Sequence, residues 1–305
     1  MTCKKLGSAG RIAQTEGMRR LPRDPIRLVS SYVPMSSAAI RGRFGRRSLV
    51  APGGPVVSLT TFGVRARSVH LTLASIGRGS VRPSRLIVWL DDAALVSSPP
   101  RGLSRLCRRG VEVRLCDDLG PHKKYFPYVS SIARHRVPMV TADDDVLYPP
   151  RWLETLVADH GRHPDAIVAH RVNRIVVDGA AVAPYERWGR ATSERPTPRN
   201  YAVGVKGVLY PPAFLDLLRA TGDGFTDVAP GSSDTWLHHC SLRAGVPVLP
   251  VVTLRGAGFW PIRGLRPSPA LLDQNVRAGR NDRVRAALWS PDDLRIVLQD
   301  HWDAC

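Results

Sequence analysis

The chain has 305 residues, enough for one large domain or two modest ones, and its hydrophobic fraction of 43% is ordinary for a globular protein. It contains no run of about 18 apolar residues, the length that a membrane-spanning helix needs. The five cysteines are scattered without C-x-x-C spacing, which argues against a disulfide framework and against a structural zinc site. With no signal-peptide pattern at the N-terminus, we expect a globular protein of the cytoplasm.

The net charge of +18 is uneven along the chain. Residues 1–50 hold eleven Lys and Arg against two acids, a net charge of +9. Such a segment suits anionic partners such as an anionic membrane surface, nucleic acid or a phosphorylated substrate, and a solvated tail explains it equally well. A Pro/Gly cluster at 52–55 follows, so residues 1–54 are predicted to be a flexible basic segment. Met18 and Met35 are alternative start sites.

From residue 55 onward the sequence alternates between two periodicities. Short apolar runs predict strands, and apolar residues spaced three and four apart predict helices. The predicted strands are 56–62, 86–90, 111–116, 138–142, 166–170, 203–210 and 246–252. The predicted helices begin near Val69, Leu103, Tyr125, Arg151 and Ser233, with two more at 271–276 and 284–288. This order is typical of an α/β domain with a mostly parallel sheet, placed at residues 55–290 and followed by a tail at 291–305.

Three successive predicted strands end in acidic residues. These are Asp91-Asp92, Asp117-Asp118 and Asp143-Asp144-Asp145. Ligands of parallel sheets bind beyond the carboxyl ends of the strands, so these groups are expected to face one rim. Three adjacent carboxylates repel one another, and a bound cation is the simplest way to relieve the repulsion. Asp143 and Asp145 can hold a hard divalent cation that keeps positions free for phosphate oxygens, unless the triplet is a solvated acidic turn.

Several blocks of the sequence together resemble glycosyltransferases of the GT-A type, in particular bacterial enzymes that build surface or capsular polysaccharides. The blocks are Val57–Phe62, Asp118–Tyr125, the Asp triplet with Tyr148-Pro149-Pro150, His170-Arg171, Gly204–Pro212 and Asp234–Leu237. They lie in collinear order over roughly residues 55–290. The resemblance implies a single GT-A (Rossmann-like) domain with long acceptor-side loops. It also implies Mn²⁺ or Mg²⁺ and transfer of a sugar from a nucleotide-sugar, a UDP- or GDP-sugar, to a hydroxyl of a glycan or a lipid-linked sugar.

The resemblance assigns the donor to the carboxyl ends of the first four strands. In the D-x-D motif it implies, Asp145 binds the metal, and Asp143 lies near the metal or the ribose. Lys123 and Lys124 are expected to meet the diphosphate, although a solvated helix start explains them as well. The predicted donor set is Thr60, Thr61, Asp91, Asp92, Lys123, Lys124, Asp143 and Asp144.

The resemblance assigns the acceptor side to later residues. Asp234 is the predicted general base for the acceptor hydroxyl, because family members carry an acidic pair before Trp-Leu; here Ser233 stands in place of the second acid. Direct displacement with such a base implies inversion at the anomeric carbon. The alternative is that Ser233 or Asp234 is a plain helix N-cap. The predicted acceptor residues are His170, Tyr185, Trp188 and Lys206, for which hydrogen bonding within the fold, loop packing and solvent exposure are the alternatives.

Two other functions remain open from the sequence. The segment from Asp143 to Val146 satisfies the D-x-D-x-[TV] pattern of haloacid dehalogenase-type phosphatases, with Asp143 as nucleophile and Asp145 as acid/base. That motif normally follows the first strand of its domain, and here three strands precede it. A basic nucleic-acid-binding protein is the non-enzymatic alternative, but no helix-turn-helix, zinc or RNA-recognition signature is present, so no dedicated nucleic-acid site is expected. Residues 1–50 are expected to allow peripheral contact with the inner face of the cytoplasmic membrane.

Overall fold

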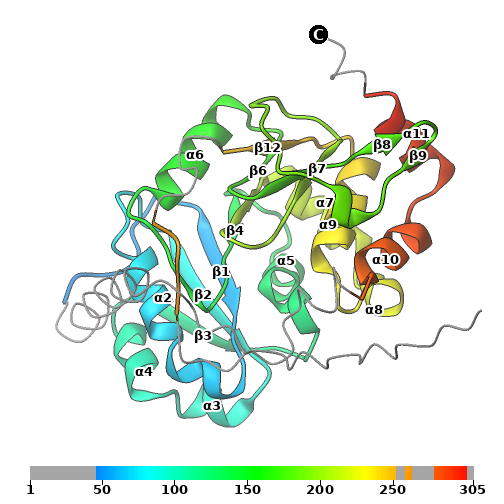
Figure 1. The fold of residues 1–305 in the computed structure, drawn as a ribbon. Coiled ribbons are helices and arrows are strands. Elements are labelled where there is room, and N and C mark those ends of the chain that lie inside the picture. Colours follow the sequence, from blue (N-terminus) through cyan, green and yellow to red (C-terminus); the bar gives the residue numbers. More distant parts are fainter. Residues whose placement is uncertain (1–45, 252–257, 263–277, 301–305) are drawn as a thin grey trace, which may run out of the picture.

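The computed structural model describes residues 46–251, 258–262 and 278–300, and its centre is a seven-stranded sheet (Figure 1). The strand order is β12-β6-β11-β4-β1-β2-β3. Their bounds are β1 (Val56–Thr60), β2 (Arg85–Leu90), β3 (Val111–Leu115), β4 (Met139–Thr141), β6 (Ile167–Ala169), β11 (Val208–Tyr210) and β12 (Val248–Pro250). β11 pairs antiparallel with β4 and β6, and all other neighbours are parallel. The predicted α/β class with a mostly parallel sheet is confirmed.

Helices cover both faces of the sheet, because successive strand residues point to opposite sides. Val57 and Leu59 share one core with Leu73, whereas Val56 shares the other with Tyr128. The first core is closed by α2 (Val69–Ile76), α4 (Arg101–Cys107) and α6 (Trp152–Arg162). The second is closed by α5 (Phe126–Ser131), α7 (Pro212–Thr221) and α9 (Ser233–Arg243). Figure 1 shows α2 and α4 on one side of the sheet and α5 and α9 on the other.

Shorter elements connect and decorate these layers. On the first half of the chain they are η1 (Gly63–Arg67), α3 (Ala93–Ser97), η2 (Gly120–Lys124) and β5 (Val146–Leu147), which pairs with β13 (Trp260–Pro261). On the second half they are β7 (Val172–Arg174), β8 (Val177–Asp178), β9 (Ala181–Val182), η3 (Tyr185–Arg187), β10 (Asn200–Ala202), α8 (Phe225–Val228) and α10 (Arg280–Leu288). The predicted helix at 271–276 lies outside the described residues.

The structure differs from the sequence analysis at two places in the second half of the chain. The strand predicted at 203–210 is reduced to β11, because Lys206 and Gly207 adopt left-handed φ values of 72° and 100° and turn the chain. The sequence analysis did not predict α7, which begins at Pro212 and buries Phe214. Proline in the first helical turn is favourable, so the Pro pair marks a helix start there.

The ends of the described chain also differ from the predicted boundaries. The buried Leu49 donates its N–H to Arg109 O at 2.9 Å, so packing of the domain begins before residue 55. Residues 291–298, predicted as tail, form α11 (Pro291–Leu298), with a capping box at Ser290 and a fully buried Val297. Residues 1–45 and 301–305 of the predicted flexible ends lie outside the described residues.

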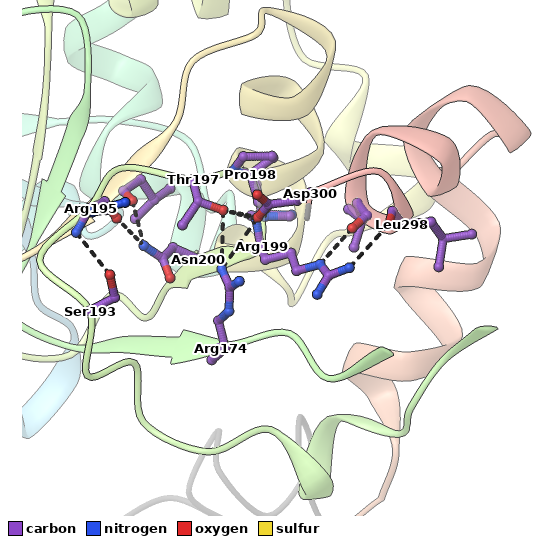
Figure 2. Close-up of polar contacts among 12 residues, drawn as sticks. Arg174, Ser193, Arg195, Thr197, Pro198, Arg199, Asn200, Leu298 and Asp300 are labelled. Atoms are coloured by element: carbon purple, nitrogen blue, oxygen red, sulfur yellow. Dashed lines mark hydrogen bonds and ion pairs between the residues drawn. The ribbon is translucent and has the colours of Figure 1, made fainter. Parts of the chain in front are cut away.

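Polar contacts fasten α11 to the domain (Figure 2). The Arg199 guanidinium donates to the carbonyls of Val297 at 2.7 Å and Leu298 at 3.1 Å, which are orphan acceptors at a helix C-terminus. Thr197 accepts from Arg174 at 3.1 Å and itself donates to Asp300. Within the described ranges no helix is both long enough and apolar enough to cross a membrane.

Candidate active site

The Asp triplet lies where predicted, directly after β4, and its middle member is the buried one. Asp144 accepts a hydrogen bond of 2.6 Å from Thr61 Oγ1 and one of 2.9 Å from Arg65 Nε. Its side chain is only 7% exposed. A carboxylate held in this way is fixed in orientation, so Asp144 acts as a strut between β4 and the loop after β1.

Arg65 also reaches the outer carboxylate of the triplet. Its terminal nitrogen lies 2.7 Å from Asp145 Oδ2, and the Asp145 side chain is 42% exposed. Burial raises the pKa of Asp145, Arg65 opposes this shift, and the neighbouring charges of Asp143 and Asp144 add to it. Part of the repulsion within the triplet is thus relieved by a cation of the chain itself, which the sequence analysis did not foresee.

Lys124 joins the triplet to the predicted general base. Its ammonium pairs with Asp143, and the charge of Asp234 also acts on it. Ser58 fixes the backbone below by donating from Oγ to Lys124 O at 2.7 Å. The structure therefore brings Asp143, Lys124 and Asp234 together, although they come from three separate segments.

Asp234 lies in the first turn of α9, but it is not the cap of that helix. The N-cap is Ser232, so the alternative prediction of Ser233 or Asp234 at that position is wrong. Asp234 Oδ2 instead accepts the N–H of Gly204 at 2.9 Å. A Cβ at position 204 would lie 2.8 Å from Asp234 Oδ1, so any side chain there would displace the Asp234 carboxylate. Burial raises the pKa of Asp234, and Lys124 opposes the shift, which are the conditions expected of a carboxylate base.

A second group of charges lies at the ends of β2 and β3. Lys123, 5% exposed in its side chain, pairs with Asp91 and, at 2.8 Å, with Asp118. Asp92 instead caps α3, accepting from Ala94 N at 2.8 Å and Leu95 N at 3.1 Å. The predicted nucleoside residue Asp91 thus faces the rim, while Asp92 has a structural task.

Thr60, the last of the residues predicted to contact the nucleotide sugar, has its hydroxyl directed at the neighbouring strand β2. Its Oγ1 donates to Trp89 O at 3.1 Å, next to the end of β2. Thr60 and Thr61 therefore both have their hydroxyls engaged within the fold.

Two of the predicted acceptor residues are buried in the fold. His170 is 4% exposed, its Nε2 lies 3.1 Å from Trp152 O, and burial lowers its pKa to about 4. Trp188 is 6% exposed and donates its indole N–H to Ala183 O at 2.9 Å. Both side chains are therefore too buried in this structure to contact a sugar directly.

The other two predicted acceptor residues lie nearer to Asp234. The Tyr185 hydroxyl accepts from Asn173 Nδ2 at 3.1 Å, and burial together with the charge of Asp234 raises its pKa to about 12. Lys206 follows Gly204 by two residues, and its ammonium lies 5.0 Å from the centre of the Phe259 ring. The charge of Asp234 thus reaches Tyr185, whereas Lys206 is related to Asp234 only through the loop of Gly204.

The donor chemistry of Asp143 and Asp145 fits a hard divalent cation that is shared with a substrate. Within the described ranges, no group of three His, Cys, Asp or Glu side chains could hold a metal by itself. Mg²⁺-like ions are commonly held by one or two carboxylates, with substrate phosphates and water completing the coordination. Asp145 is the more exposed of the two carboxylates and would be the main protein ligand, with Arg65 remaining on Asp144.

The sequence analysis gave no role to two arginines that follow strands of the sheet, Arg65 and Arg171. Arg65 follows the first strand by five residues, and Arg171 follows the fifth predicted strand directly. A signal was available for Arg65, because loops after parallel strands meet at one edge and the acidic triplet needs cations there. Spacing in the sequence did not indicate which arginine would fill that role.

Comparison with known proteins places the fold but gives no close relative. No protein-family profile matches the chain, and no curated protein matches its sequence. Among solved structures, the chain is similar to the mannosyltransferase PcManGT from Pyrobaculum calidifontis in complex with GDP-Man and Mn²⁺, with a TM-score of 0.50 and 14% identity over 89% of this chain and 78% of that one. At this identity the likeness shows a shared fold, and with the sheet order it confirms the predicted GT-A (Rossmann-like) architecture.

Two other solved structures align less well. GalNAc-T7 with UDP, GalNAc and Mn²⁺ has a TM-score of 0.45 and 13% identity, over 72% of this chain and 47% of that one. CMP:2-keto-3-deoxy-manno-octonic acid synthetase with CTP has a TM-score of 0.38 and 12% identity, over 65% and 89%.

Proposed function

We propose that this protein is a metal-dependent glycosyltransferase that moves a sugar from a UDP- or GDP-sugar to a hydroxyl of a glycan or lipid-linked acceptor, with inversion. One observation carries the proposal: at the carboxyl edge of the sheet, Lys124 pairs with Asp143 and also feels the charge of Asp234, the predicted base, whose pKa is raised. A fold shared with a mannosyltransferase adds support.

On the donor side, Asp143 and Asp145 would hold the Mn²⁺ or Mg²⁺ ion together with the diphosphate. When bound, the ion would supply positive charge to balance the negative charge of the departing diphosphate. Lys124 adds a positive charge at the same place, and Lys123 keeps Asp91 beside the nucleoside. Asp144 binds neither ligand directly in this proposal, because Thr61 and Arg65 occupy its oxygens.

On the acceptor side, Asp234 takes the proton of the attacking hydroxyl. The new bond forms between the acceptor oxygen and the anomeric carbon, while the bond from that carbon to the diphosphate oxygen breaks. The proton ends on the Asp234 carboxylate, and the electron pair leaves with the nucleoside diphosphate. Attack opposite to the leaving group inverts the anomeric centre. The raised pKa of Asp234 makes it a better base than an exposed carboxylate.

Thermal-shift measurements with UDP- and GDP-sugars, each with and without Mn²⁺, test this proposal. Ligand binding to the native state raises the melting temperature, so one nucleotide sugar with Mn²⁺ should give a larger shift than either component alone. Asp145→Asn should lose the Mn²⁺-dependent part of the shift. Asp178→Asn, an exposed carboxylate paired with Arg187, is the control and should keep it. If Asp145→Asn binds donor and metal like the wild type, the metal assignment is wrong.

The phosphatase alternative has less support. The Asp triplet follows the fourth strand of the chain, and Asp143 is paired with Lys124. Absence of hydrolysis of a chromogenic phosphate ester would dispose of this alternative. For the nucleic-acid alternative, retention on DNA that disappears when residues 1–50 are removed would indicate general attraction to the basic segment. We propose a cytoplasmic location with peripheral contact of that segment with anionic membrane lipid.

A further inference from the structure

Three cationic residues, Arg171, Arg190 and Lys206, lie on neighbouring loops in the second half of the chain. Lys206 lies between β10 and β11, Arg171 follows the end of β6 by two residues, and Arg190 bridges to β7 at Asn173. Arg190 donates to His170 O at 3.5 Å. Arg171 O accepts the N–H of Val203 at 2.9 Å, which ties the Arg171 loop to the loop of Lys206.

The electrostatics agree with this placement. Burial lowers the pKa of Lys206, and the charges of Arg190 and Arg171 lower it further. Arg171 also acts on the Tyr185 hydroxyl, on which the charge of Asp234 acts as well. Arg171 therefore lies close enough to act on both Lys206 and Tyr185, and the charge of Asp234 reaches the same tyrosine.

The backbone holds Lys206 in an unusual conformation. Its φ of 72° lies in the left-handed region, which is uncommon for a residue with a side chain. Trp152 stabilises the turn by donating its indole N–H to Lys206 O at 2.7 Å, and a Cβ at Gly207 would lie 2.6 Å from the Trp152 ring. Strain that the surrounding structure maintains is typical of ligand sites, because it fixes a side chain in advance.

Lys206 and Arg171 differ in their partners from the lysines and the arginine of the donor side. In the part of the chain that the structure describes, neither Lys206 nor Arg171 forms an ion pair with an Asp or Glu side chain; the contact of Lys206 is the Phe259 ring. This contrasts with Lys123, Lys124 and Arg65, each paired with aspartate. A bound anion would remove the repulsion among the three cations, and arginine and lysine are the residues that bind phosphate and carboxylate.

We propose that Arg171, Arg190 and Lys206 form an anion-binding subsite that holds a phosphate or carboxylate group of the acceptor, next to the hydroxyl that Asp234 deprotonates. The inference rests on the proposed glycosyl transfer and narrows its acceptor to an acidic or phosphorylated glycan or lipid-linked sugar. The subsite is separate from the donor diphosphate, which the triplet side of the rim binds.

Titration with inorganic phosphate, followed by calorimetry and thermal shift, tests the subsite. Each titration is run alone and again with Mn²⁺ and saturating UDP or GDP, which fill the donor position. Phosphate should bind under both conditions. Arg171→Gln and Lys206→Asn should each weaken it about tenfold or more, the value of one charge-assisted hydrogen bond. Asparagine suits position 206, because it tolerates the left-handed conformation while removing the charge.

The control is Arg187→Gln, an exposed arginine of η3 paired with Asp178 at 3.0 Å. It should bind phosphate like the wild type, which excludes a general effect of net charge. The inference is overturned if the two subsite variants bind phosphate as the wild type does. It is also overturned if the nucleotide displaces phosphate and the same variants lose nucleotide affinity, since the cations then serve the donor. If the wild type itself binds neither UDP nor GDP, that result contradicts the proposed function and not the subsite.

Discussion

The charged residues at the rim are paired differently on the two halves of the central sheet. On the half formed by β1 to β4, the carboxylates are matched by lysine and arginine: Asp91 by Lys123, Asp143 by Lys124, and Asp144 by Arg65. On the half formed by β6, β11 and β12, Asp234 is held by the N–H of Gly204, and Lys206 and Arg171 have no acidic partner within the described residues.

The difference bears on function. A charge-matched rim is rigid before a ligand arrives, and a metal with a diphosphate can exchange into it without leaving an unpaired charge. The unmatched half retains charges whose partners a ligand has to supply. We therefore expect substitutions on the first half to change donor binding, and substitutions on the second half to change turnover and acceptor recognition.

The largest effect is expected for Asp234→Asn, which should abolish proton transfer on the second half of the rim and leave donor binding on the first half unchanged. Asparagine keeps the shape and can still accept the Gly204 N–H, but it cannot take a proton. Turnover, measured as release of nucleoside diphosphate from the matching donor, should fall about 10²–10⁴-fold. The Mn²⁺-dependent thermal shift should persist. Normal turnover in this variant would remove Asp234 from the mechanism.

The pH dependence of turnover should report the same carboxylate. Burial raises the pKa of Asp234, so protonation inactivates the base at a higher pH than it would for an exposed aspartate, whose pKa is about 3.9. Turnover should fall as the pH drops through this raised pKa, and the acidic limb should disappear in Asp234→Asn. His170, whose pKa is about 4, should add no limb near pH 6.5. An acidic limb that survives in the variant would belong to another group.

Folding stability should show the opposite trend for this residue. A carboxyl whose folded pKa lies above its unfolded value binds its proton more tightly in the native state. Its contribution to stability is greatest at low pH and is lost as the pH rises through the folded pKa. Comparison of the melting temperatures of wild type and Asp234→Asn across this range gives the sign directly.

A smaller effect is expected from Gly204→Ala, which sharpens the comparison by moving the base without removing it. The added methyl group would lie 2.8 Å from Asp234 Oδ1, and such overpacking costs about 1–3 kcal/mol of unfolding free energy. Turnover should fall while donor binding stays. Gly189→Ala is the matched control, because its Cβ would meet no atom within 4 Å, and both variants can be compared by urea unfolding.

The smallest effect is expected on the first half, from Asp92→Ala. This variant removes the cap of α3 and should cost about 1 kcal/mol of unfolding free energy, without changing nucleotide affinity. Calorimetric titration with UDP or GDP measures that affinity. A large loss would restore Asp92 to the nucleoside site that the sequence analysis assigned to it.

Most of the first half was predictable from the sequence. The strands β1, β2 and β4 are mostly apolar and buried on both faces, whereas β3, at the edge of the sheet, alternates apolar and charged residues; the helices between the strands show apolar residues at regular spacing. The acidic strand ends followed from the parallel order. The second half was harder to predict from the sequence. Its strands β6, β11 and β12 have three residues each, and the sequence analysis did not predict the helices α7 and α11.

Sequence alone determined the α/β class, the order of the main strands and the position of the acidic triplet, because burial and periodicity are properties of neighbouring residues. Only the tertiary structure decided which of the predicted site residues are buried, which cap a helix and which pair with an opposite charge. It buried Asp144 and Trp188, made a cap of Asp92, and placed Arg65 and Lys124 among the carboxylates. These assignments depend on contacts between segments far apart in the chain, whose distances and burial no local pattern records.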